Sequence, residues 1–257
     1  MNKFQKLLNK KSKSKIISLS AYSKNIASVI DDYCDIVLVG DSLGSVLYNF
    51  KSTKKVTLDM MIEHSKSVRL GVKKSLMVVD MPYRTYQNKR QALTNARKIL
   101  KETKCEAVKL EGGFKIKSIV EYLIKNKIPV MGHLGLLPQS IKGKFKSKGK
   151  TEREKNKLIS ESKLLESLGV FAIVLECIRG KTADLITKSI SIPTIGIGSS
   201  AHCDGQVLVT DDLVGLNSTS IKFVKKFVNI KKEINRGIKK YKLEVLKSSF
   251  PSKKYSY

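Results

Sequence analysis

The chain repeats one pattern: a short run of apolar residues, a polar turn, and then a longer amphipathic segment. The apolar runs are continuous rather than alternating, which is typical of strands buried on both faces of a parallel sheet. The longer segments have the three-to-four-residue apolar spacing of helices, as in Gln91–Thr103 and Glu152–Leu168. The predicted strands are Ile16–Ala21, Ile36–Gly40, Leu76–Asp80, Ala107–Leu110, Pro129–Gly132, Ala172–Glu176, Thr194–Gly198 and Val207–Val209.

Eight strands that alternate with helices in 257 residues predict an α/β fold, a (β/α)8 TIM barrel. An open, doubly wound sheet is the alternative architecture. No linker, repeat or change in composition divides the chain, so we expect residues 1–257 to form a single domain with an N-terminal helix. The tail from about Ile221 to Leu246 is predicted as a C-terminal helical extension that covers the barrel or an oligomer contact.

The net charge of +28 raises the alternative of a non-catalytic, basic RNA-binding protein. Lysine accounts for 43 of the 50 basic residues, and the lysines are scattered along the whole chain. Proteins that recognise bases or bind phosphate groups favour arginine, whose guanidinium offers several donors in a fixed geometry. No nucleic-acid-binding motif is present in the sequence. We therefore expect solvated lysine-rich helix faces and no specific nucleic-acid partner.

Cysteine usage and hydropathy indicate the compartment. The four cysteines are Cys34, Cys105, Cys177 and Cys203, and none forms a C-x-x-C pair. Free thiols in a reducing cytoplasm are the simplest interpretation. The apolar runs are far shorter than the roughly 20 residues that span a bilayer. We expect a cytoplasmic protein with no membrane partner and no export signal.

Polar residues gather where the predicted strands end. Asp41, Asp80, Glu111 and Glu176 each stand at or just after a strand, with Lys109 and His133 beside them. Any one carboxylate could simply cap the following helix. In a parallel barrel, however, the carboxyl ends of all strands meet at one rim, where barrel active sites lie. The set as a whole therefore predicts a functional site.

The composition of this set favours one kind of chemistry. Several carboxylates without a Cys/His cluster suit a hard cation such as Mg²⁺. A 2-oxo acid can chelate such an ion, which stabilises negative charge on the keto oxygen and makes an enolate accessible. A carboxylate outside the metal site could act as the base, and a lysine could offset the anionic charge.

A series of short motifs, in order over nearly the whole chain, resembles the ketopantoate (3-methyl-2-oxobutanoate) hydroxymethyltransferase family. The matching motifs are Ser20-Ala21-Tyr22, Val39-Gly40-Asp41-Ser42, Asp80-Met81-Pro82-Tyr83, Lys109-Leu110-Glu111-Gly112-Gly113, Gly132-His133-Leu134-Gly135, Pro138-Gln139-Ser140, Leu175-Glu176-Cys177, Pro193-Thr194-Ile195-Gly196 and Asp204-Gly205-Gln206. A single G-x-G would be weak support, whereas this ordered series is specific.

The resemblance implies a barrel of the phosphoenolpyruvate/pyruvate type that transfers a hydroxymethyl group from 5,10-methylenetetrahydrofolate, the co-substrate, to 3-methyl-2-oxobutanoate. The product, 2-dehydropantoate, leads to pantothenate and coenzyme A. A homodecamer is also implied. Carried over by position, Asp41, Asp80 and Glu111 bind Mg²⁺, and Asp41, Ser42, Asp80 and Lys109 bind the oxo acid. Glu176 is the proton acceptor.

Two assignments stay open. His133 is either a buried histidine satisfied beside the site or a residue that takes part in it. Ser42 either contacts substrate or caps the next helix. Within enzymes, the alternative function is a related 2-oxo-acid barrel lyase, although the K-K-C-G-H-type loop of such lyases is missing.

Two loops depart from the family pattern. Ser199-Ser200-Ala201-His202 replaces a glycine-rich segment, and the loop Ile141–Lys150 has Lys144-Phe145-Lys146 where a glycine is expected. We expect these changes to affect folate binding and loop closure, and to leave the carboxylates at the strand ends unaffected.

Overall fold

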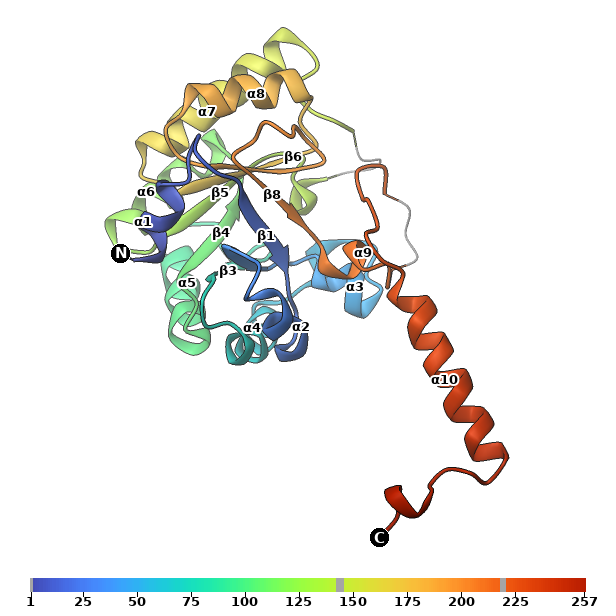
Figure 1. Cartoon of the computed structure of the whole chain (residues 1–257). Helices are drawn as coiled ribbons and strands as arrows, with labels where there is room; N and C mark the ends of the chain where they lie inside the picture. The colour runs from blue at the N-terminus through green and yellow to red at the C-terminus, as the bar shows by residue number, and fades with distance from the viewer. Residues whose placement is uncertain (1, 142–145, 218–220) are drawn as a thin grey trace. The chain divides into compact units, whose positions relative to one another are not determined.

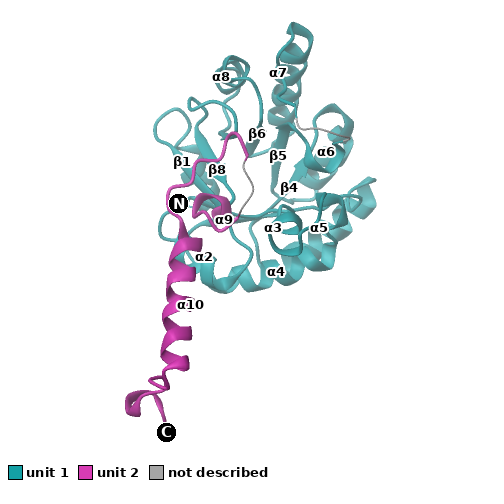
Figure 2. Cartoon of the chain, turned by 90° about the vertical axis from the view of Figure 1, so that its right-hand side faces the viewer, with its two compact units in different colours: residues 1–209 teal, residues 210–257 magenta. Residues whose placement is uncertain are grey.

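The computed structural model describes residues 2–141, 146–217 and 221–257. The chain divides into two compact units, residues 1–209 and residues 210–257, which Figure 2 shows in different colours. The expectation of a single barrel domain spanning residues 1–257 therefore stays a prediction.

The first unit is a closed barrel of eight parallel strands, in which β8 pairs with β1 (Figure 1). This confirms the predicted (β/α)8 fold and excludes the open sheet. The strands are β1 (Ile16–Ser20), β2 (Ile36–Val39), β3 (Leu76–Asp80), β4 (Ala107–Glu111), β5 (Val130–Gly135), β6 (Ala172–Glu176), β7 (Thr194–Ile197) and β8 (Gly205–Leu208). All eight predicted strands are present, with ends that differ by at most three residues.

Helices and 3₁₀ turns connect the strands. In this unit they are α1 (Lys3–Leu8), α2 (Lys24–Ile30), α3 (Leu43–Tyr48), η1 (Thr53–Lys55), α4 (Leu58–Gly71), α5 (Lys89–Thr103), η2 (Phe114–Ile116), α6 (Lys117–Lys125), η3 (Pro138–Ser140), α7 (Glu152–Ser167) and α8 (Gly180–Ser189). Polar caps set several starts: Thr57, Asn88 and Thr151 each accept a hydrogen bond from the third residue beyond. The predicted N-terminal helix is thus present as α1.

Alternate residues of each strand point to opposite faces, and this period of two explains how the interior is filled. The inward residues at the amino-terminal side are apolar and form their own buried cluster, which includes Ile16, Leu76, Ala107 and Met131. A second, larger cluster packs the outward residues against the helices. Two or four residues further along the same strands, the inward series turns polar, at Lys109 and His133 after two residues and at Asp80 after four. The polar rim is therefore a continuation of the barrel's inner face.

Helix α1 plugs the amino-terminal end of the barrel. Leu7 is buried in the inner cluster, and the ring of Phe4 meets Phe171 edge-on, with ring centroids 5.0 Å apart. Behind the helix, the Lys11 ammonium pairs with the buried Asp204 carboxylate at 2.8 Å. The inner cluster is thus sealed on the side opposite the polar rim.

A buried carboxylate fixes the turn before β3. Asp31 accepts hydrogen bonds from the backbone N–H groups of Lys73, Lys74 and Ser75 at 2.8 to 3.2 Å. Burial alone would raise the pKa of Asp31, but these hydrogen bonds outweigh it and hold the pKa below its ordinary value. The ionised carboxylate is therefore the form that stabilises this turn.

Replacing Asp31 by Asn should lower the free energy of unfolding by about 1–3 kcal/mol at neutral pH, because an amide accepts these bonds poorly. A group with a depressed native pKa stabilises the fold above its unfolded pKa, and this stabilisation disappears as pH falls through the native pKa. Urea unfolding at several pH values should therefore show the two proteins converging in acid. The control Asp32→Asn, which removes an exposed pair with Lys74, should change stability by less than about 1 kcal/mol. Equal losses in both variants would contradict the assignment.

The second unit contains α9 (Thr210–Leu213), α10 (Ile230–Leu246) and η4 (Lys253–Tyr255). The predicted helical tail is confirmed from Ile230 but wrong for residues 221–229. There the backbone turns back instead, and Phe227 and Ile230 donate to the carbonyls of Leu213 and Val214. The side chain of Asn229 then caps α10 by accepting from the backbone of Lys232.

None of the helices in the described part of the chain has both the length and the apolar character that a bilayer crossing requires.

Candidate active site

The predicted acidic residues meet at the carboxyl-terminal rim of the barrel. Asp80, Glu111 and Glu176 are the last residues of β3, β4 and β6, and Asp41 is the second residue after β2. The backbone N–H of Asp41 donates to Oδ2 of Asp80 at 3.1 Å. Both carboxylates are buried. Two residues 39 positions apart in the sequence therefore share one corner of the site.

Lys109 supplies the positive charge of this corner. Its ammonium lies 2.9 Å from Oδ1 of Asp80, and both side chains are only 5% exposed. Burial alone would lower the pKa of Lys109, but the charges of Asp80, Glu111 and Asp41 outweigh burial and raise it. The lysine is therefore a permanent cation at the barrel's inner face.

The carboxylates outnumber this cation. Burial, together with the neighbouring charge of Asp80, raises the pKa of Asp41 to about 7. Burial and the charge of Asp41 also raise the pKa of Glu111. Such shifts report negative charge that the protein's own groups do not fully balance.

His133, on β5, connects this corner to Glu176. Its Nδ1 lies 3.4 Å from the Lys109 ammonium and 3.7 Å from Glu111, and its Nε2 lies 3.1 Å from Oε2 of Glu176. Burial and the charge of Lys109 lower the pKa of His133, which favours the neutral ring. Because an ammonium can only donate, Nδ1 is the accepting nitrogen, and the proton on Nε2 faces Glu176. The structure thus brings His133 into the site.

Glu176 differs from the other carboxylates in its accessibility. Its side chain is 14% exposed, against 5% for Asp80 and 3% for Glu111. The backbone around it is closely packed: a Cβ at Gly135, where φ is +99°, would lie 2.2 Å from the Glu176 carbonyl oxygen. Only glycine fits there. Glu176 is therefore held firmly at the edge of the site, where a ligand can reach its carboxylate.

Ser42, the remaining predicted ligand of the oxo acid, is half-buried beside Asp41. It stands at the N-terminal boundary of α3, but its side chain makes no capping hydrogen bond there. Instead, its hydroxyl lies 2.8 Å from the hydroxyl of Tyr22. The capping interpretation of Ser42 is therefore wrong, and its side chain belongs to the rim.

Two residues of this site escaped sequence reasoning. Gln139, in η3, donates from Nε2 to Oδ2 of Asp41 at 2.8 Å, and Tyr86 donates its hydroxyl to Oε1 of Gln139. Both are neutral and lie in loops, so a search for charged strand ends passes over them. The one available signal was the position of Gln139 shortly after β5, within a motif of the family.

The residues at the rim suit a divalent cation. Among the described residues, Oδ1 of Asp80 is buried with no hydrogen-bond partner beyond its ion pair with the Lys109 ammonium, 2.9 Å away. In the described ranges, no three His, Cys, Asp or Glu side chains are arranged so that they could hold a metal ion together, so a cation here would need further ligands from water or substrate. Mg²⁺ usually takes one or two protein carboxylates and fills its other positions with water or substrate. The pair Asp41 and Asp80 meets that requirement.

In the two loops that depart from the family pattern, the described residues make contacts of their own. In Ser199–His202, the hydroxyl of Ser200 donates to Asp184, and Nδ1 of His202 lies 3.2 Å from the same carboxylate. In the loop Ile141–Lys150, residues 142–145 lie outside the described residues, Lys144 and Phe145 among them. Its far end is anchored where Thr182 donates to the Gly149 carbonyl.

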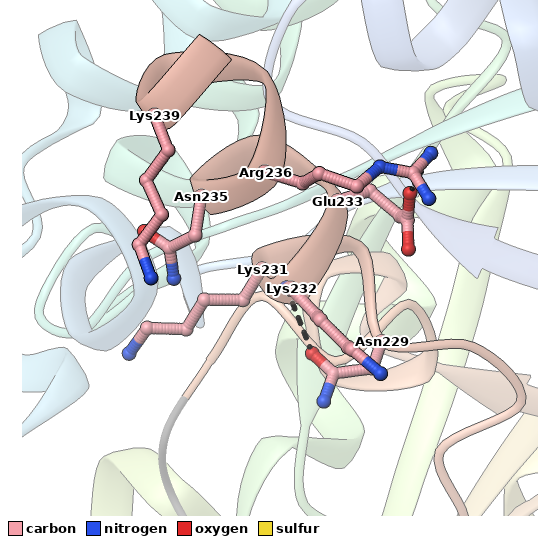
Figure 3. A pocket seen from close by; sticks show the side chains of 7 residues that line it. All are labelled: Asn229, Lys231, Lys232, Glu233, Asn235, Arg236 and Lys239. Atoms are coloured by element: carbon pink, nitrogen blue, oxygen red, sulfur yellow. Dashed lines mark hydrogen bonds and ion pairs between the residues drawn. The ribbon is translucent and has the colours of Figure 1, made fainter. Parts of the chain in front are cut away.

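The second unit has a hollow of its own along the start of α10 (Figure 3). Its lining is Asn229, Lys231, Lys232, Glu233, Asn235, Arg236 and Lys239. Its one carboxylate, Glu233, pairs with Arg236 at 2.6 Å. Cations and amides dominate the lining of this hollow. The candidate active site is therefore the barrel rim, where buried carboxylates lie together with a lysine and a histidine.

Comparisons with known proteins bear on what this rim does. Residues 1–253 match the family model described as ketopantoate hydroxymethyltransferase. A 3-methyl-2-oxobutanoate hydroxymethyltransferase of Pelagibacter ubique is 65% identical over 260 residues, with all of both chains covered. The Caulobacter vibrioides protein of the same name is 44% identical and covers 94% of this chain and 89% of its own.

Solved structures agree on the fold. Phosphonopyruvate hydrolase in complex with oxalate and Mg²⁺ superposes with a TM-score of 0.65 at 12% identity, covering 99% of this chain and 93% of its own. A 2,3-dimethylmalate lyase, described as a member of the PEP mutase/isocitrate lyase superfamily, gives a TM-score of 0.55 at 12% identity, covering 76% and 72%. At such identities these similarities concern the barrel architecture alone.

Proposed function

The chain belongs to the ketopantoate hydroxymethyltransferase family, and from that premise we propose that it transfers a hydroxymethyl group from 5,10-methylenetetrahydrofolate to 3-methyl-2-oxobutanoate. The product is 2-dehydropantoate, the precursor of pantothenate. The observation that carries the proposal is the buried cluster of Asp41, Asp80, Lys109 and Glu111 beside the more accessible Glu176. Such a cluster suits an anionic, chelating substrate from which a proton is removed.

Asp41 and Asp80 would hold Mg²⁺, with Glu111 bound directly or through water. When bound, the ion supplies Lewis-acid stabilisation of negative charge on the 2-oxo group. Lys109 and Ser42 bind the oxo acid, and the lysine offsets the charge of its carboxylate. These residues fix C3 of the substrate near Glu176.

Glu176 then takes the proton from C3. The neutral His133 orients its carboxylate through Nε2, which lies 3.1 Å away. The enolate carbon then attacks the methylene carbon carried by the folate, and a carbon–carbon bond forms. The two C–N bonds of that methylene break, and water adds its oxygen to the carbon as the new hydroxyl. Tetrahydrofolate leaves with two protons on its nitrogens, one from C3 of the oxo acid and one from the water. General base catalysis of this kind contributes about 10²–10⁴-fold to a rate.

The proposal includes the setting of the enzyme. The four unpaired cysteines fit a reducing cytoplasm. Apolar residues at helical spacing on α10, namely Ile234, Ile238, Tyr241 and Val245, are each more than 40% exposed in the single chain, which supports a homo-oligomer. A decamer is the size that the family resemblance implies. Small-molecule ligands, rather than nucleic acid or membrane, are the proposed partners.

Proton NMR in D₂O tests the reaction directly. With 3-methyl-2-oxobutanoate and MgCl₂ but without folate, the enzyme should exchange the C3 proton for deuterium, and EDTA should abolish the exchange. 2-Dehydropantoate should form only when 5,10-methylenetetrahydrofolate is added. Consumption of the oxo acid without folate would indicate a lyase. Lack of exchange, combined with salt-dependent binding of generic RNA, would favour the non-catalytic alternative.

A further inference from the structure

Gln139 has every polar atom of its side chain engaged, although it is a loop residue and only 3% exposed. Its Nε2 donates to Oδ2 of Asp41 at 2.8 Å and to the carbonyl of Met81 at 3.0 Å, and its Oε1 accepts from the hydroxyl of Tyr86. A carboxylate and a carbonyl can only accept, so the NH₂ group must face them. The amide therefore has one satisfied orientation.

The backbone of the same residue reaches a second carboxylate. The N–H of Gln139 donates to Oε2 of Glu111 at 3.0 Å. Gln139, which follows β5, thus contacts residues that follow or end three other strands. These are Asp41 after β2, Met81 and Tyr86 after β3, and Glu111 at the end of β4. The position of Gln139 ties together the carboxyl ends of four consecutive strands.

These contacts leave each carboxylate partly free. Asp41 accepts from Gln139 through Oδ2, and Glu111 accepts through Oε2, so the other oxygen of each carboxylate stays available for a ligand. Rotation of either carboxylate would break a buried hydrogen bond. Two acids that carry like charge are thereby held in place before any cation arrives.

We propose that Gln139 is a positioning residue that presents Asp41 and Glu111 to the divalent cation, and that Tyr86 fixes the orientation of its amide. The inference rests on the proposed function, since it concerns the cation of that site. Loss of an outer contact to a metal ligand typically weakens metal binding about 10- to 100-fold. Gln139 should therefore set metal affinity rather than the chemical step.

Binding of Mn²⁺ alone, followed by EPR on metal-free protein, measures this affinity. Gln139→Met should raise the Kd for Mn²⁺ about 10- to 100-fold. Tyr86→Phe should raise it less, because the amide keeps its own donors. The matched control Gln5→Met alters an exposed glutamine of α1 whose side chain donates to Asn9, and it should leave the Kd unchanged. In deuterium exchange, Gln139→Met should need more metal for half-maximal rate yet approach the wild-type rate at saturation.

An unchanged Kd in Gln139→Met, with or without a lower Tm, would overturn the proposal and leave Gln139 a packing residue. If Gln139→Met does not fold, Tyr86→Phe decides: a raised Kd supports the proposal and an unchanged one overturns it. Failure of the proposed function has a different signature, because wild-type protein itself would then bind no Mn²⁺ and exchange no proton.

Discussion

Replacing Glu176 by Gln should lower the rate of C3 proton exchange by about 10²–10⁴-fold, the usual contribution of a general base. Glutamine keeps the shape of the side chain and can still lie against Nε2 of His133, 3.1 Å away in the native site. It cannot accept a proton at neutral pH. The loss should fall on kcat, since the carboxylates and Lys109, which we propose bind the oxo acid, are untouched. Deuterium incorporation by NMR reports the affected step without the folate reaction.

The control for this variant is Glu152→Gln, which alters a side chain on α7 that is 80% exposed and pairs only with Lys155. Its exchange rate should match that of the wild type. Mn²⁺ binding and Tm should be unchanged in both variants. If Glu176→Gln exchanges the proton at the wild-type rate, another group is the base.

Replacing Asp41 by Asn should weaken metal binding by more than the 10- to 100-fold expected of an outer contact, because a direct ligand loses its charge. The same change should leave the metal-free protein as stable as the wild type, or more so. Asp41 is buried against the like charge of Asp80, and both factors raise its pKa to about 7. An uncharged amide removes that repulsion and still accepts from Gln139. Metal affinity and metal-free stability should therefore change independently.

Thermal unfolding with and without MgCl₂ separates these two effects. A ligand present at 100 times its Kd stabilises the native state by about 2.7 kcal/mol. The wild-type Tm should rise accordingly on adding Mg²⁺, whereas that of Asp41→Asn should not. Asp59→Asn, at an aspartate that is 80% exposed and paired with Lys98, serves as the matched control. An equal rise in Asp41→Asn would exclude Asp41 as a metal ligand.

The barrel was predictable because the signal for each strand is local. Strands such as Leu76–Asp80 and Ala107–Glu111 are buried along their whole length, and burial on both faces is what produces a continuous apolar run. Parallel strands then place all their carboxyl ends at one rim. Asp80, Glu111 and Glu176 could thus be brought together from the sequence without knowing a single contact.

Gln139 and Tyr86 could not be found in this way. The bond between Gln139 and Asp41 spans 98 positions, and it depends on the exact course of two loops. A neutral amide also leaves no charge pattern that would single it out from other loop residues. The prediction of where α10 starts was wrong for a related reason. Residues 221–229 have an acceptable helical pattern, but their backbone forms hydrogen bonds with residues at the end of α9 instead of continuing a helix.

Helix α1, with Phe4 and Leu7, limits the side from which ligands can enter the barrel. Because α1 closes the amino-terminal end of the barrel, a ligand of the buried Asp41 and Lys109 would reach them from the carboxyl-terminal rim. On the function proposed above, if the folate donor binds nearer the rim than the oxo acid, the oxo acid has to bind before it. The product would then leave after the spent folate, and product-inhibition patterns would reveal that order.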